Sequence, residues 1–274
     1  MDFPGQVVAV ANQKGGVGKT TTAINLGTAL SAVGKRVLLV DADPQGNAST
    51  GLGVSAAQRA MNTYDLIMHG APLDDVRSAT RLPNLDIVPA TPDLSSVDVS
   101  LVGDSNRLFR LRQGLRGDAP GEREAPASTA QYDYILIDCP PSLNMLTVNA
   151  MVAAHSVLVP LQCEFFALEG LSQLLITIRQ IRQSHNPELR LMGVVLTMYD
   201  RRNNLSAQVA ADVRENLAGL VYDTVIPRNV RLSEAPSHAL PAIIYDHTCS
   251  GSIAYQKLAA ELLARERGVL AEAG

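Results

Sequence analysis

The stretch "ANQKGGVGKTTTAINL", from Ala11 to Leu26, decides the fold of this chain. An apolar, β-branched run comes before it, and from Thr20 onward the residues follow a helical pattern. The glycines between these segments allow a tight turn whose N–H groups point inward. With the positive end of the following helix, such groups form an anion site. The stretch therefore predicts a strand, a phosphate-binding loop and a helix, in that order.

The loop also carries side chains suited to a nucleotide. Lys19 would neutralise the β- and γ-phosphates, the Thr20 hydroxyl would bind Mg²⁺, and Thr21 would support the α-phosphate. The strict pattern GxxxxGK[ST] fails, because Gln13 stands where its first glycine belongs. A glycine-rich turn with a solvated lysine is the simpler alternative, but the order of strand, loop, Lys-Thr and helix favours a phosphate site. The second lysine, Lys14, has no role in the usual pattern.

Apolar runs alternate with helical patterns along the rest of the chain. Helices are expected at residues 20–33, 168–184 and 205–217. Strands are expected at Val7–Ala11, Arg36–Val40, Leu85–Val88, Tyr134–Ile137, Ser156–Pro160, Leu191–Thr197 and Tyr222–Ile226. Such alternation predicts a mostly parallel sheet with helices on both faces, and we interpret residues 1–274 as a single doubly wound α/β domain. The Gly-, Pro- and charge-rich stretch 114–131 interrupts the pattern and predicts a flexible surface loop.

Composition narrows the class of protein. Hydrophobic residues make up 46% of the 274 residues, which is enough for a large core, and the formal net charge is −4. That charge argues against a dedicated nucleic-acid binder but leaves room for a local basic patch. No apolar run has the roughly 18 residues of a membrane span, and Met1–Gln6 lacks the pattern of a secretory signal. Three scattered cysteines without metal-site spacing predict a reduced, cytoplasmic protein.

Three aspartates follow predicted strands. Asp41 and Asp43 come directly after one strand, at the carboxyl edge of the sheet where open α/β folds bind ligands. Asp138 ends the apolar run Tyr134–Ile137, and an acid there is costly unless it is paired or lies near a metal. The alternatives are a turn-forming Asp-Pro pair for the first two residues and a capping role for Asp138.

Four motifs resemble one family. "KGGVGKT" (Lys14–Thr20) is similar to the deviant Walker A motif of the ParA/Soj and MinD ATPases, which are P-loop NTPases. "VLLVDADPQGNAST", "YILIDCPPS" and "IPRNVRLSEAPSH" resemble the ParA/Soj chromosome-partition branch in particular. The resemblance covers nearly the whole chain in the expected order. The long loop near Gly114 departs from the compact form of the family.

The resemblance implies roles for individual residues. ATP would be held by Lys14, Gly15, Gly16, Val17, Gly18, Lys19, Thr20 and Thr21. In the ATP-bound dimer of the family the first lysine crosses to the partner's phosphates, which gives Lys14 the role of an arginine finger delivered in trans. By the same resemblance, Asp43 orients the attacking water, while Thr20, Asp41 and Asp138 lie at the Mg²⁺ ion, Asp138 at the Walker B position.

The motif "IPRNVRLSEAPSH" implies two more contacts. Its first residues close over adenine in relatives, which points to Pro227 and Asn229. Met198 would pack near the base or in the core. Arg201, Arg202, Arg228 and Arg231 lack aromatic neighbours suited to stacking bases, so they would bind the phosphates of any duplex. The family places a DNA patch at positions matching Arg202 and Arg231. Solvated surface arginines or arginines in salt bridges are the alternative.

The resemblance implies an ATP-driven partition switch: an ATP-dependent homodimer binds non-specific double-stranded DNA, and a ParB-like centromere-binding partner stimulates slow hydrolysis. The protein would be cytoplasmic and associated with the nucleoid, and no membrane binding is expected. A MinD-like membrane-cycling ATPase is the alternative, but residues 252–270 fit a helix packed on its own domain equally well. A nitrogenase-like or ligase-like relative is a third possibility, although its cysteine pattern is missing here.

Overall fold

The computed structural model describes residues 5–117 and 129–273. Its centre is one sheet with the strand order β3-β4-β2-β5-β1-β6-β7, in which β3 alone runs antiparallel to its neighbour. This confirms the predicted α/β fold with a mostly parallel sheet. The strands are β1 Gln6–Val10, β2 Val37–Asp41, β3 Ser78–Ala79, β4 Leu85–Val88, β5 Tyr134–Asp138, β6 Ser156–Gln162 and β7 Arg190–Thr197.

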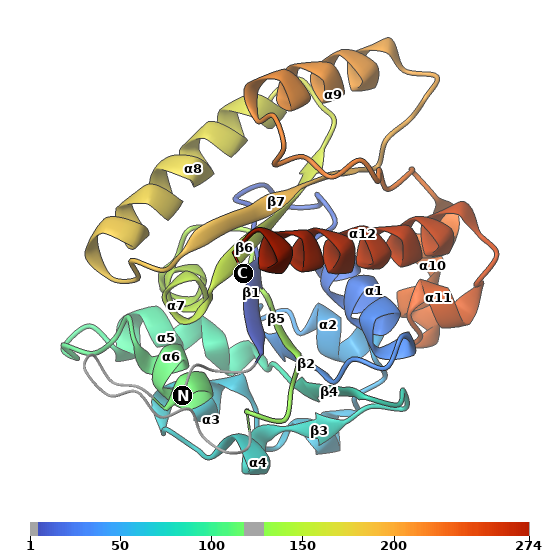
Figure 1. Ribbon diagram of the computed structural model, residues 1–274. Coiled ribbons are helices and arrows are strands. Elements are labelled where there is room, and N and C mark those ends of the chain that lie inside the picture. Colours follow the sequence, from blue (N-terminus) through green and yellow to red (C-terminus); the bar gives the residue numbers. More distant parts are fainter. Residues whose placement is uncertain (1–4, 118–128, 274) are drawn as a thin grey trace.

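Helices cover both faces of the sheet (Figure 1). The α-helices are α1 Lys19–Ala32, α2 Asn47–Gly51, α3 Thr63–Met68, α4 Leu73–Val76, α5 Val97–Ser100, α6 Arg110–Arg116, α7 Met145–Ala153, α8 Ala167–Ser184, α9 Asn204–Asn216, α10 Val230–Glu234, α11 Ala242–Tyr245 and α12 Ser250–Ala273. The described part of the chain also contains three short 3-10 helices, η1 Ala56–Arg59, η2 Pro92–Ser96 and η3 Ala235–His238.

The core forms two layers because strand side chains alternate between the faces of the sheet. In β1, Val7 and Ala9 join the layer that also contains side chains of α7, α8 and α9. Val8 and Val10 join the opposite layer, with side chains of α1 and α12. β1 is buried on both faces and lies between β5 and β6. The loop after β1 is therefore held at the centre of the carboxyl edge of the sheet.

Two predicted elements need correction. Tyr222–Ile226 is not a strand, because it forms no continuous ladder with β7: the N–H groups of Tyr222 and Ile226 donate to the Val194 and Leu196 carbonyls at 2.9 and 2.8 Å, and isolated bridges lie at Val221 and Pro227. The predicted loop at 114–131 begins too early, because Gly114 lies inside α6. A Cβ at Gly114 would meet Leu66 of α3 at 2.6 Å, so glycine permits the close packing of the two helices. Residues 118–128 of that prediction lie outside the described residues.

The C-terminal helix α12 uses its apolar side within the fold. Tyr255, Leu258 and Leu262 are each exposed by 1% or less, and they belong to the core layer that includes α1. Of the alternatives considered for this segment, packing on its own domain is the one observed. None of the helices in residues 5–117 and 129–273 is long and apolar enough to cross a membrane.

Candidate nucleotide site

The loop between β1 and α1 is fixed by backbone geometry and by neighbouring strands. Gly16 and Gly18 have φ angles of 75° and 87°, a region that side chains with a Cβ rarely enter. Thr197, the last residue of β7, donates a hydrogen bond from its hydroxyl to the Val17 carbonyl at 2.8 Å. Asn12 donates from its amide to the Pro160 carbonyl of β6 at 2.8 Å. The loop is thus shaped before any ligand arrives.

The first turn of α1 provides backbone donors. Gly18 is its N-cap residue, no side chain among the described residues caps it, and the first turn contains no acidic residue. The N–H groups of this turn therefore face the loop without an internal acceptor, at the positive end of the helix. This arrangement attracts an anion, as the sequence predicts.

Lys19 brings a buried cation to the loop. It is 6% exposed, and its Nζ donates to the Lys14 carbonyl at 2.9 Å. Burial lowers the pKa of Lys19, while the charges of Asp138 and Asp43 act in the opposite direction. A bound phosphate would offset the desolvation of this ammonium group.

Asp41 and Asp138 lie side by side at the ends of β2 and β5, where they are paired in register. Both are fully buried. The Asp41 carboxylate accepts hydrogen bonds from the backbone and hydroxyl of Ser49 at 2.8 and 2.7 Å. Within the described residues, neither carboxylate oxygen of Asp138 meets hydrogen-bond geometry with any partner. Asp138 is therefore the less satisfied carboxylate of the pair.

The surroundings of Asp138 shift the pKa of its carboxyl group. Burial first, and then the charge of Asp41, raises the pKa of Asp138 well above its ordinary value. The Thr20 hydroxyl and the Lys19 ammonium lie close enough to lower it. A divalent cation beside Asp138 would remove the cost of the buried negative charge, and oxygen ligands are those that Mg²⁺ prefers. The donor set therefore fits Mg²⁺.

Asp43 is also nearly buried, with 7% exposure. Its carboxylate accepts from the Gln45 backbone at 3.0 Å, and its carbonyl accepts from Gly46 at 2.9 Å. The turn-forming role considered for Asp43 is thus present. The same residue contributes to the electrostatics of both Lys19 and Asp138, so it also lies at the site.

Lys14 has a different environment from Lys19. Its ammonium group forms an ion pair with Glu164, in the turn between β6 and α8, and each of the two side chains is 42% exposed. Glu164 also accepts from the side-chain amide of Gln162. Lys19 is therefore directed into its own loop, whereas Lys14 is held at the surface of the sheet edge.

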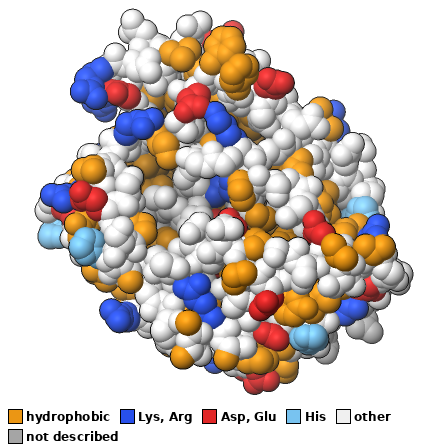
Figure 2. Space-filling model, turned by 180° about the vertical axis from the view of Figure 1, so that it is seen from behind, with side chains coloured by type: hydrophobic (Ala, Val, Ile, Leu, Met, Phe, Trp, Pro, Cys, Tyr) orange, Lys and Arg blue, Asp and Glu red, His pale blue; other side chains and the backbone are white. Residues whose placement is uncertain are grey.

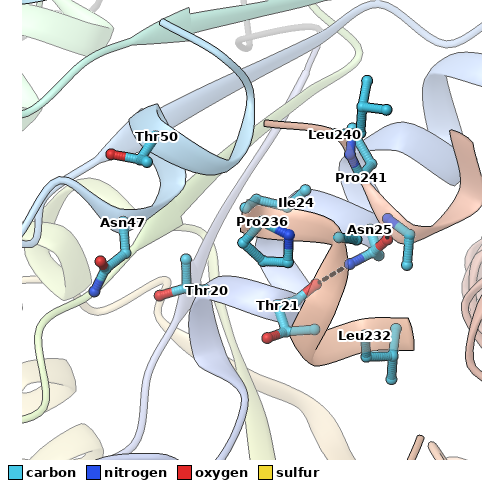
Figure 3. Close-up of a pocket in the computed structure, with 12 residues that line it drawn as sticks. Thr20, Thr21, Ile24, Asn25, Asn47, Thr50, Leu232, Pro236, Leu240 and Pro241 are labelled. Atoms are coloured by element: carbon cyan, nitrogen blue, oxygen red, sulfur yellow. Dashed lines mark hydrogen bonds between the residues drawn. The ribbon is translucent and has the colours of Figure 1, made fainter. Parts of the chain in front are cut away.

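A cavity of about 270 Å³ adjoins the loop on the side of α2 and α10 (Figure 3). Of the predicted phosphate-binding residues, Thr20 and Thr21 line it. Asn47 and Thr50 of α2 and Pro236 of η3 form other parts of its wall. Polar hydroxyl and amide groups thus continue from the phosphate loop toward a partly apolar wall.

Comparisons with known proteins agree with this geometry. The family model described as "AAA domain" matches residues 5–191. The chain is 60% identical over 270 residues to the chromosome partitioning protein ParA of Caulobacter vibrioides (strain NA1000 / CB15N), which covers 98% of both chains. The chain belongs to the ParA family of chromosome-partitioning ATPases. It is also 50% identical to the sporulation initiation inhibitor protein Soj of Bacillus subtilis (strain 168), over 95% of this chain and 99% of Soj.

Solved structures extend the ParA comparison. A structure titled cobyrinic acid a,c-diamide synthase from Mycobacterium smegmatis, with bound ATP analogue and magnesium, has a TM-score of 0.79 and 35% identity, and the match covers 96% of each chain. The ATP analogue and magnesium in that structure are the kinds of ligand that the phosphate loop and Asp138 of this ParA-family ATPase would fit.

The predicted adenine loop of this ParA-family chain has its own contacts. Pro227 forms an isolated bridge with Tyr199, which follows Met198 at the end of β7. The Asn229 carboxamide accepts from the Arg231 backbone and donates to Ser250, both at 2.8 Å. Neither Pro227 nor Asn229 lines the cavity beside Thr20. Their contact with adenine stays a prediction.

The four arginines considered for DNA contact are all exposed, but they fall into two groups. Arg202 forms hydrogen bonds with Asp200 at 3.1 and 3.2 Å, and the charge of Arg228 also acts on Asp200. Arg201 precedes Arg202 in the same turn. Arg231 pairs separately with Glu234 at 2.8 Å and Asp246 at 3.5 Å. Around the hollow in Figure 2, basic and acidic side chains are mixed.

Sequence reasoning missed three residues of this ParA-family site. Ser49 holds Asp41, Thr197 fixes the phosphate loop, and Glu164 holds Lys14. Ser49 lies within a motif that was recognised, "VLLVDADPQGNAST", although its role was not. Glu164 and Thr197 are 150 and 180 positions away from their partners, and no local pattern joins them.

Proposed function

We propose that this ParA-family ATPase is an ATP-dependent DNA-partition switch. Its ATP-bound homodimer binds non-specific double-stranded DNA, and slow, partner-stimulated hydrolysis releases the DNA, which drives chromosome or plasmid segregation. The observation that carries the proposal is the buried Asp138 carboxylate, whose oxygens no described residue fully satisfies, beside Lys19 and the first turn of α1, which no described side chain caps. A buried carboxylate and a buried lysine are costly unless a ligand such as Mg²⁺-ATP joins them.

Each residue has a defined task in the proposed ATP site. The backbone from Gly15 to Gly18 and the side chains of Lys19 and Thr21 bind phosphate. Thr20 and Asp138 hold Mg²⁺, while Asp41, tied to Ser49, orients the Mg²⁺ shell. When bound, Mg²⁺ offsets the negative charge on the phosphates. Asp43 orients the attacking water, and Pro227 and Asn229 close over adenine.

Lys14 is the residue proposed to couple ATP binding to dimer formation. In the free subunit its ammonium group lies at the surface, paired with Glu164. In the dimer it reaches the phosphates of the partner subunit and stabilises the negative charge of the transition state. The surface position supports this role, since a side chain buried in its own loop could not cross to a second subunit.

DNA binding is assigned to Arg201, Arg202, Arg228 and Arg231, which are exposed. Because three acidic residues lie among them, one subunit offers a weak site. A dimer doubles the number of arginines, and this reconciles DNA binding with a net charge of −4. A ParB-like protein is the proposed stimulating partner, and the cytoplasmic nucleoid is the proposed location.

The other functions considered have less support. A MinD-like membrane cycle requires a free apolar helix side, whereas α12 buries Leu258 and Leu262 in the core. The name of the Mycobacterium smegmatis structure suggests a ligase, but that match is 35% identical, against 60% for the Caulobacter ParA protein. Partition is therefore the favoured function.

The proposal can be tested by measuring DNA retention on a surface. Four conditions are compared, each at two salt concentrations: no nucleotide, ADP, ATP, and ATP with the Asp43→Ala variant. We expect retention only with ATP, retention that persists in the variant because hydrolysis is slowed, and weaker binding at high salt. Lys14→Ala should abolish retention with ATP. Absence of retention in every condition, or retention that is insensitive to salt, would contradict the mechanism.

A further inference from the structure

Two aromatic side chains stand exposed beside Lys14. Phe165 is 73% exposed and Phe166 is 64% exposed. They directly follow Glu164, the ion-pair partner of Lys14. The chain contains only four phenylalanines, so two of them are placed in solvent at one point of the sheet edge. Single exposed apolar residues are ordinary, but two large adjoining rings form a patch that needs an explanation.

The patch is rigidly presented. The two rings contact each other edge to face, with centroids 5.1 Å apart and an interplanar angle of 86°. Buried residues flank them on both sides, Cys163 before and Ala167 after. The Ala167 N–H donates to the Glu164 carbonyl at 2.9 Å, and the Gly170 N–H donates to the Phe166 carbonyl at 3.3 Å, so the rings lie on the turn that starts α8. The backbone that carries the rings is thus already ordered before they are covered.

The neighbours of the patch indicate what covers it. Lys14 is proposed to reach the phosphates of a second subunit, so the surface around it must come close to that subunit. Glu164 places Phe165 and Phe166 on this same surface. In a two-fold symmetric dimer both subunits bury the same surface, so an apolar patch close to the symmetry axis packs against its own copy. Phenylalanine rings carry no charge, so they offer an apolar contact rather than one suited to DNA phosphates or acidic side chains.

We propose that Phe165 and Phe166 form the apolar contact surface for a second copy of this chain in the ATP-bound dimer. This inference rests on the proposed function, because the dimer itself is part of that proposal. Aromatic side chains bury about 150–250 Å² each, and such residues carry much of the binding energy at the centre of interfaces. Lys14 makes the dimer depend on ATP, and the aromatic pair gives it an area of contact that does not depend on charge.

The test compares dimerisation of full-length variants by sedimentation velocity, with Mg²⁺ and a non-hydrolysable ATP analogue. The variant is Phe165→Ser with Phe166→Ser. The matched control is Val99→Ser with Val102→Ser, two residues near α5 that are 78% and 67% exposed. We expect the phenylalanine variant to weaken the dimer at least about tenfold, since both copies lose the contact. The control should dimerise like the wild type.

Two further readouts separate the explanations. Binding of a fluorescent ATP analogue to the monomer and the thermal midpoint should both stay unchanged in the phenylalanine variant, because the rings lie in solvent. A variant that dimerises like the wild type overturns this inference and leaves the proposed function intact. A wild-type protein that stays monomeric with the analogue overturns the proposed dimer and this inference with it. Loss of nucleotide binding in the variant also overturns the assignment, since the effect would then arise in the ATP site.

Discussion

At the scale of single residues, the two lysines of the loop have different surroundings. Lys19 is buried and bonded to the loop backbone, whereas Lys14 is half exposed and paired with Glu164. The proposed crossing of Lys14 to a second subunit requires this ion pair to break. An exposed ion pair contributes up to about 1 kcal/mol, so Glu164 opposes dimerisation weakly.

Replacing Glu164 with Gln should therefore strengthen the ATP-dependent dimer by up to about thirtyfold, since each of the two subunits gives up one such pair. The physical reason is that Lys14 no longer has to leave a carboxylate of its own subunit. Sedimentation with a non-hydrolysable ATP analogue measures the change. Glu169→Gln, an exposed residue of α8, removes the same charge close by and serves as the control. A weaker dimer in Glu164→Gln would show that the carboxylate supports the contact.

Asp138 is the second residue whose environment leads to a prediction. Asp138→Asn should stabilise the ligand-free protein by about 1–3 kcal/mol at neutral pH, because it removes a buried carboxylate that the described residues leave incompletely hydrogen-bonded. The same variant should lose the extra stability that Mg²⁺ gives in the presence of ADP. Thermal unfolding with and without Mg²⁺ measures both effects, with the exposed Asp98→Asn of α5 as control. A destabilised ligand-free variant would contradict this account.

At the scale of elements, α12 is connected to the segment beside β7 through Glu261 and Arg265, and Arg265 donates to the Val221 carbonyl at 2.8 Å. Glu261 accepts from the Asp223 and Thr224 backbones at 2.8 and 2.9 Å and pairs with Arg265 at 2.7 Å. Partial burial acts to raise the pKa of Glu261, but the Thr224 and Asp223 hydrogen bonds and the Arg265 charge outweigh it, so the pKa is lowered. This contact holds the segment that was wrongly predicted as a strand.

Glu261→Gln should destabilise the protein by about 1–2 kcal/mol at pH 7, because hydrogen bonds to a charged acceptor are weakened. The pKa is lower in the folded state, so the contribution is present above the unfolded value near 4.5 and is lost as the pH falls through the lowered value. Urea unfolding at pH 7 and pH 4 measures the free energy of unfolding of the wild type and the variant. The difference between the two proteins should be smaller at pH 4 than at pH 7. The exposed Glu215→Gln of α9 is the control. An equal loss at both pH values would assign the effect to packing.

At the scale of the whole molecule, DNA binding depends on summing charges over two subunits. Arg202 and Arg231 each have acidic neighbours, so neither forms a strong site by itself. In a dimer each substitution removes two positive charges from the DNA surface. The effect should therefore be read in the salt dependence of binding as well as in the affinity.

Arg202→Ala or Arg231→Ala should each lower the slope of log affinity against log salt by about 2 per dimer. ATP-dependent DNA retention at several salt concentrations gives this slope. Arg179→Ala, an exposed arginine of α8, removes equal charge and should leave the slope unchanged. If all three variants behave alike, net charge decides binding and no defined patch exists. Dimerisation with the ATP analogue should stay normal in every variant.

The sequence by itself determined the order of strands and helices and the place of the phosphate loop. Buried parallel strands are continuous apolar runs, and glycines with Lys-Thr mark the loop, so both signals are local. Residues 222–226 misled the prediction because an apolar run beside a sheet need not complete its hydrogen bonds. Gly114 was assigned to a loop, although its missing side chain serves helix packing.

Only the tertiary structure decided which polar groups meet. Asp41 and Asp138 are almost a hundred positions apart, yet their strands are neighbours. Their packing shows that Ser49 satisfies Asp41, whereas the described residues leave Asp138 incompletely hydrogen-bonded. Lys14 likewise pairs with Glu164 because β1 and β6 are neighbouring strands whose carboxyl ends lie side by side. The same arrangement places the exposed rings of Phe165 and Phe166 near Lys14. The burial of a polar group and the identity of its hydrogen-bond or ion-pair partner depend on residues distant in sequence. Local sequence patterns carry no information about such contacts.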